Sequence, residues 1–87
     1  MDICYSEKAE KQLKRICKGD KKSAAMLVAA IEAYAADPDG NFDVKVLKGS
    51  YGDFKRLRVG RYRIIFDDEG NIMLIYEIKH RQEAYND

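Results

Sequence analysis

The sequence predicts an α+β domain, in which an N-terminal strand and a helical hairpin pack on one face of a mainly antiparallel twisted β-sheet. Apolar residues recur at helical spacing up to about residue 36, whereas from Val44 onward they alternate with charged residues at the period of strands. Segment 37–41 (Asp-Pro-Asp-Gly-Asn) marks a turn between these halves. Because the 87 residues contain no repeat and no long linker, we expect a single domain over 1–87.

The first half is expected to contain one strand and two helices. The strand covers Asp2 to Tyr5, and Ser6 stands at the N-cap position of a helix from Glu7 to about Cys17. The apolar stripe of this helix is formed by Ala9, Leu13, Ile16 and Cys17. Residues 18–20 (Lys-Gly-Asp) end it and start a second helix over 21–36, so the two helices form an antiparallel hairpin. The apolar face of the second helix comprises Ala24, Leu27, Val28, Ile31, Tyr34 and Ala35.

Four strands are expected in the second half, over residues 44–48, 53–59, 62–67 and 72–79. Gly60-Arg61 fits a two-residue type II′ turn, which would pair Arg58 with Arg63. Directly paired residues share a face of the sheet. One face would therefore receive the helices and carry Leu57, Val59, Tyr62, Ile64 and Phe66. The opposite face would carry Arg56, Arg58 and Arg63.

The next hairpin decides which face carries His80. With Glu69-Gly70 as a two-residue loop, Tyr76 lies opposite Arg63, and Ile78 and His80 follow on that same face. A three-residue loop would reverse the assignment. The two-residue loop places His80, or the residues just after it, at the edge of the arginine cluster. Residues 81–87 are expected to form a tail or one helical turn.

The basic residues are concentrated in one part of the chain. Formal net charge is +1, but residues 45–63 hold seven basic side chains against one acidic, and residues 64–87 hold two against six. The seven are Lys45, Lys48, Lys55, Arg56, Arg58, Arg61 and Arg63. Like charges opposed in a sheet destabilise it, by under about 1 kcal/mol per pair. We therefore interpret the arginine face as an anion-binding surface rather than an ordinary solvated face, since fixed cations bind phosphates.

Arginines near His80, Arg81 and Tyr85 suggest metal-free cleavage of RNA. This reaction needs a base for the ribose 2′-OH, positive charge for the crowded phosphorane and an acid for the 5′-oxygen leaving group. Guanidinium groups supply the charge, while histidine and tyrosine can transfer protons; the sequence does not assign base and acid. The aromatic residues Tyr51, Phe54 and Tyr85 could stack on bases, although Phe54 could equally belong to the core.

The two cysteines, Cys4 and Cys17, favour buried free thiols over a disulfide. The N-terminus has no signal-peptide pattern and the chain has no apolar run near 18 residues, so we expect a cytoplasmic protein without membrane contact. With one histidine and no cysteine pair at ligand spacing, we expect neither a metal site nor another cofactor.

The sequence resembles the RelE/ParE toxin superfamily, specifically the RelE-type mRNA interferases of bacterial and archaeal toxin–antitoxin pairs. The similar parts are the opening strand and helical hairpin and the segments 46–49 (VLKG), 54–66 (FKRLRVGRYRIIF) and 80–85 (HRQEAY). The resemblance covers essentially the whole chain. It implies a RelE-like fold, with the catalytic residues Arg56, Arg58, Arg63, His80, Arg81 and Tyr85. The substrate would be bound by Lys45, Lys48, Lys55 and Arg61.

The resemblance also implies a function and partners. Such a toxin cleaves mRNA in the ribosomal A site, with the ribosome ordering the substrate, and is inhibited by a cognate antitoxin in a hetero-oligomeric complex. Two alternatives remain: a non-enzymatic inhibitor of DNA gyrase, as in the ParE branch of the same fold, and a degenerate member that only binds antitoxin or RNA. The HR-x-E-x-Y ending, at residues 80–85, favours the nuclease branch.

Overall fold

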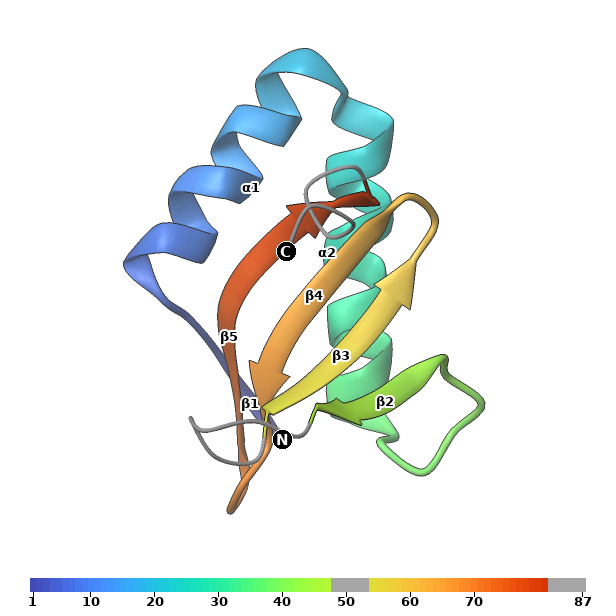
Figure 1. The fold of residues 1–87 in the computed structure, drawn as a ribbon. Coiled ribbons are helices and arrows are strands. Elements are labelled where there is room, and N and C mark those ends of the chain that lie inside the picture. The colour runs from blue at the N-terminus through green and yellow to red at the C-terminus, as the bar shows by residue number, and fades with distance from the viewer. Residues whose placement is uncertain (48–53, 82–87) are drawn as a thin grey trace.

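The computed structural model describes residues 1–47 and 54–81. Five strands form one sheet in the order β1-β5-β4-β3-β2, in which β1 runs parallel to β5 and the other neighbours are antiparallel. Both helices cover the same face of this sheet (Figure 1), which confirms the predicted α+β fold. The elements are β1 (Asp2–Tyr5), α1 (Glu7–Gly19), α2 (Lys21–Ala36), β2 (Val44–Leu47), β3 (Phe54–Val59), β4 (Tyr62–Asp67) and β5 (Ile72–His80).

Capping residues set the limits of the two helices. The Ser6 hydroxyl oxygen accepts a hydrogen bond from the backbone N–H of Ala9 at 3.0 Å, as expected for an N-cap. Asp20 serves both helices: its N–H donates to the Ile16 carbonyl at 2.7 Å, and its carboxylate accepts from the Ser23 N–H at 3.1 Å. Because one residue ends α1 and starts α2, the helices follow one another without a linker, as the sequence predicts.

The core lies between the helices and the sheet. Tyr34 on α2 is 3% exposed and packs edge-on against the fully buried Phe66 of β4, with ring centroids 4.9 Å apart. The other buried apolar side chains are Ala9, Ala24, Leu27, Ile31, Ala35, Leu57, Ile64, Met73, Ile75 and Ile78. The predicted burial of the thiols is wrong, because Cys4 and Cys17 are free but exposed. Cys4 alternates with the inward-facing Ile3 and Tyr5, and Cys17 lines a groove between α1 and α2.

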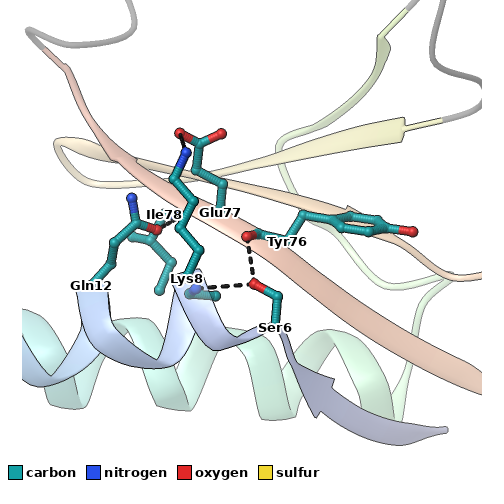
Figure 2. Close-up of polar contacts among 7 residues, drawn as sticks. Ser6, Lys8, Gln12, Tyr76, Glu77 and Ile78 are labelled. Carbon is teal, nitrogen blue, oxygen red and sulfur yellow. Dashed lines mark hydrogen bonds and ion pairs between the residues drawn. The ribbon is translucent and has the colours of Figure 1, made fainter.

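Ser6 and the following helix α1 complete the outer edge of β5. The four-residue strand β1 pairs only with residues 72–75 of β5. Beyond this point Ser6 donates from its N–H to the Ile75 carbonyl (2.8 Å) and from its hydroxyl to the Tyr76 carbonyl (2.6 Å). Further along, the Gln12 side-chain oxygen accepts from the Ile78 N–H at 2.7 Å (Figure 2). The helix thus takes the place of a neighbouring strand and covers part of an edge that could otherwise pair with another chain.

Replacing Gln12 by alanine is expected to lower the free energy of unfolding by about 1–3 kcal/mol, because the part-buried Ile78 N–H loses its acceptor. Urea denaturation measures this loss. Gln12→Glu keeps an oxygen at the same distance along the side chain and is the matched control. Equal losses in the two variants would show that the hydrogen bond is not the source of the effect.

The β3–β4 hairpin has the predicted register. Val59 pairs with Tyr62, Arg58 with Arg63 and Leu57 with Ile64. Gly60 has φ +57°, and no described non-glycine residue has a positive φ, as a type II′ turn with glycine first requires. The predicted division of this hairpin into an apolar face and an arginine face is therefore confirmed.

The β4–β5 register differs from the prediction. Arg63 lies opposite Lys79 instead of Tyr76, and the last pair before the loop is Asp67 with Leu74. The connection is therefore longer than two residues, and the register also shifts between Ile65 and Phe66. A three-residue offset reverses the faces, since side chains alternate along a strand.

Candidate nucleic-acid interface

The sheet face opposite the helices carries a row of cations across three neighbouring strands. Arg58 on β3 pairs with Arg63 on β4, which pairs with Lys79 on β5. Lys45 on β2 extends the basic surface, because it pairs with Arg56 two residues before Arg58. Sequence reasoning missed Lys79. Its place in the row depends on the β4–β5 register, which the hairpin residues alone do not determine.

Four arginines converge at the tip of the β3–β4 hairpin. The Arg81 N–H donates to the Arg61 carbonyl at 2.6 Å, and this bond brings the end of β5 beside the turn. Arg58, Arg61, Arg63 and Arg81 line a recess of about 10 Å³ together with Gly60 and Tyr62. This volume is about that of one water-sized group. The recess therefore suits a single oxygen atom of an anion, and guanidinium groups are preferred donors to phosphate oxygens.

Arg56 lies on the same face but has a different environment. Its Nη2 forms an ion pair with Asp43 at 3.1 Å, and its side chain is only 12% exposed. Its Nε is buried without a hydrogen-bond partner among the described residues. Asp43 also accepts a backbone bond from the Arg58 N–H, at 3.0 Å. Arg56 therefore ties β3 to the segment before β2, whereas Arg58 is exposed to solvent.

Lys55 lies on the helix side of the sheet, because it pairs with the buried Phe66. Its ammonium group contacts the Asp68 carboxylate at 2.9 Å, and the Tyr34 hydroxyl donates to the same carboxylate at 2.6 Å. Burial raises the pKa of Asp68. The hydrogen bonds from Tyr34 and Lys55 and the charge of Lys55 together lower this pKa by more than burial raises it, so the net shift is downward. Lys55 thus belongs to a structural network and does not join the arginines.

The Asp68 network predicts an acid-sensitive part of the stability. A carboxyl with a depressed pKa stabilises the fold above its unfolded-state value and loses this contribution as pH falls through the folded-state value. The free energy of unfolding of wild type should therefore exceed that of Asp68→Asn at neutral pH. The difference should shrink below about pH 4. Denaturant titrations from pH 7 to 2.5 measure it, and a difference that stays constant with pH would rule out the ionised carboxylate as its source.

His80 is not on the arginine face, so its predicted position is wrong. It lies opposite Tyr62 on the helix side, with ring centroids 5.1 Å apart and the ring planes nearly perpendicular. The following residue, Arg81, does reach the arginine recess. Phe54 lies on the arginine face of β3, half-buried and edge-on to Tyr76 at 4.7 Å, so it is outside the core beneath the helices. The candidates Lys48, Tyr51 and Tyr85 lie outside the described residues.

Within residues 1–47 and 54–81, no group of three or more histidine, cysteine, aspartate or glutamate side chains is arranged to hold a metal ion. The helices of the same residues are too short or too polar to cross a membrane.

The fold is that of known toxins from toxin–antitoxin systems. The YoeB dimer from Staphylococcus aureus superposes with a TM-score of 0.77 at 18% identity, covering 92% of this chain and 95% of that one. RelE in the archaeal RelE–RelB complex from Pyrococcus horikoshii OT3 gives a TM-score of 0.72 at 22% identity, covering 92% and 93%. In sequence, the chain is 26% identical to Toxin RelE3 of Methanocaldococcus jannaschii over 99% of its own length and 97% of that protein.

A family model described as the ParE toxin of the type II toxin–antitoxin system parDE matches residues 3–85. The chain therefore belongs to the RelE/ParE family and is the toxin of a type II toxin–antitoxin system.

Proposed function

We propose that this toxin is a metal-independent endoribonuclease that cleaves mRNA in the ribosomal A site and thereby inhibits translation. The observation that supports this most directly is the convergence of Arg58, Arg61, Arg63 and Arg81 on one oxygen-sized recess. A phosphorane gains negative charge on its non-bridging oxygens, and guanidinium groups held in place stabilise that charge without reorganisation. Lys45 and Lys79 extend the positive surface on which the strand would lie.

The proposed reaction is attack of the ribose 2′-oxygen on the adjacent phosphorus. The P–O2′ bond forms, the P–O5′ bond breaks, one proton leaves the 2′-hydroxyl and one is delivered to the 5′-oxygen. The requirement for a 2′-hydroxyl makes RNA the substrate. Tyr85, which the family resemblance suggests for proton transfer, remains the candidate for one of these protons. His80 is not assigned this role, because it lies on the other side of the sheet from Arg63.

A cognate antitoxin is the expected protein partner. RelE proteins from Pyrococcus horikoshii and Methanococcus jannaschii are known in complexes with RelB, and Staphylococcus aureus YoeB is known in a heterotetrameric complex with YefM. We propose that this toxin also forms a hetero-oligomer with its antitoxin in the cytoplasm. Carboxylates of such a partner would suit the row formed by Arg58, Arg63 and Lys79.

The second candidate function is inhibition of DNA gyrase without catalysis. It is favoured by one observation, namely that the matching family model is that of ParE. The arginine recess would then bind a carboxylate-rich or nucleic-acid surface of the gyrase complex.

Inducible expression with mapping of mRNA 5′ ends distinguishes the two functions. For the nuclease we expect codon-phased cuts on translated transcripts and none on untranslated ones, with loss of the cuts in Arg81→Ala and Tyr85→Phe. Growth arrest with intact mRNA and damaged DNA would favour gyrase inhibition. An absence of any effect on growth would indicate a degenerate toxin that binds only its antitoxin or RNA.

A further inference from the structure

A cleft lies on the helix side of the hairpin tip, across the turn from the arginine recess. Its volume of about 290 Å³ is close to the lower end of small-ligand pockets, which is roughly 300 Å³. One wall comes from the α1–α2 turn and the start of α2, with Asp20, Ser23 and Met26. The other wall comes from the sheet, with Arg61, Tyr62 and His80.

The cleft and the arginine recess share the turn that separates them. Gly60, Arg61 and Tyr62 line both. Met26 packs against this turn, since a Cβ on Gly60 would lie 3.1 Å from the Met26 methyl carbon. A strand whose phosphate occupies the recess could therefore pass over the hairpin tip and place a neighbouring nucleotide in the cleft.

The groups in the cleft suit a base. Tyr62 and His80 form an edge-to-face pair, and aromatic rings of this kind are common stacking partners for unpaired RNA bases. Asp20 brings a negative charge that offsets the charge of Arg61, so the cleft attracts a phosphate less than the arginine recess does. Hydrogen bonds from Ser23, at 2.6 Å from its hydroxyl and 3.1 Å from its N–H, lower the pKa of Asp20 and keep the carboxylate ionised.

An ionised carboxylate only accepts hydrogen bonds, and its two oxygens can accept one more besides those donated by Ser23 and by the Lys22 backbone N–H. Adenine, cytosine and guanine each present an exocyclic amine as a donor, whereas uracil presents carbonyl oxygens at the corresponding positions and has only its ring N3–H as a donor on that edge. We propose that this cleft is a nucleobase subsite, in which Asp20 selects an amino-bearing base next to the phosphate held by the arginines. This inference rests on the proposed ribonuclease function for its biological role, but the binding itself can be tested without cleavage.

The test is an NMR titration of the full-length toxin with adenosine, cytidine, guanosine and uridine 5′-monophosphates. We expect the amide signals of residues 20–26 and of Tyr62 and His80 to shift, with the amino-bearing nucleotides binding roughly fivefold more tightly than uridine monophosphate, as one added hydrogen bond allows. In Asp20→Asn the preference should fall to about one. Asparagine is as good an N-cap as aspartate, so α2 is retained.

Two further variants separate the subsite from general effects of charge. Asp37→Asn removes the same charge at the opposite end of α2 and should keep the preference. The nucleotide phosphate should also shift the amide signals of Arg58 and Arg63, which line the recess. Met26→Trp should fill the cleft and abolish the nucleotide-induced shifts of residues 20–26, leaving those of Arg58 and Arg63. Equal affinities of wild type for all four nucleotides, or shifts confined to the arginine recess, would overturn the proposal.

Cleavage mapping distinguishes failure of this inference from failure of the proposed function. If the toxin cuts no mRNA but shows the base preference by NMR, the subsite stands and the nuclease proposal fails. If it cuts mRNA but no nucleotide shifts residues 20–26, the nuclease proposal stands and the subsite is refuted.

Discussion

For the ribonuclease function proposed above, Arg58→Ala is expected to lower the rate of mRNA cleavage about 100- to 1,000-fold, as removal of one charge-stabilising donor does in other active sites. Arg58 is exposed at the arginine recess, so its truncation opens no cavity and should leave thermal unfolding nearly unchanged. Arg81→Ala should have an effect of similar size. Single-turnover cleavage of ribosome-bound mRNA measures the rate, and thermal unfolding of the same preparations monitors the fold.

Arg56→Ala is the matched control, since Arg56 lies on the same face of β3 two residues before Arg58. It is paired with Asp43 and largely covered, so we expect lower stability but little change in the rate per folded molecule. Arg58→Lys keeps the charge and removes the forked geometry, so it should recover only part of the activity. If Arg56→Ala abolished cleavage in a fully folded protein, the phosphate would have to bind nearer the start of β3, away from the recess.

Local patterns in the sequence determine the elements and the first hairpin. The N-cap at Ser6 and the shared cap at Asp20 are short-range signals that need no tertiary information. The Gly60-Arg61 turn fixes the register of β3 and β4, and hence places Arg58 opposite Arg63. The alternation along two short strands is then sufficient to separate an arginine face from an apolar one.

The position of β5 depends on contacts that are distant in sequence. Asp67 accepts a hydrogen bond from the Glu69 N–H at 2.8 Å, and Asp68 is held by Tyr34 on α2 and by Lys55 on β3. These bonds are consistent with a connection longer than the two-residue turn that Gly70 suggests. The resulting offset brings Lys79 to the cationic row and turns His80 away from it. The alternation of side chains along one strand cannot reveal this offset, because Asp68 in the β4–β5 connection is held by partners 13 and 34 residues away in the sequence.

The basic residues of β3 differ in whether a carboxylate of the folded chain pairs with them. From the sequence, Arg56 and Arg58 are both expected to be catalytic and Lys55 is expected to bind the substrate. Alternation alone places Lys55 on the helix side, but the carboxylates that pair with Lys55 and Arg56 become identifiable only in the folded chain. The arginine recess therefore includes only some of the basic residues of segment 45–63, namely Arg58, Arg61 and Arg63. Arg81 joins them from the end of β5.

Phe66→Ala is expected to have the largest effect on stability, about 3–5 kcal/mol, because it empties a fully buried site against the Tyr34 ring. Domains of this size are stable by roughly 5–15 kcal/mol, so a large part of the total would be lost. Denaturant unfolding at 25 °C measures the change. Phe66→Leu retains most of the apolar volume and should cost clearly less.

Phe66→Ala also tests whether the core supports the arginine recess. Phe66 adjoins the register shift in β4. On the Arg63 side of this shift, Arg63 lies opposite Lys79, and Arg81 reaches the turn at Arg61. Toxicity of Phe66→Ala should therefore fall with the folded fraction and return under conditions that restore folding, whereas Arg58→Ala should stay inactive when fully folded. A change of less than about 1 kcal/mol in Phe66→Ala would mean that the neighbouring core can fill the space.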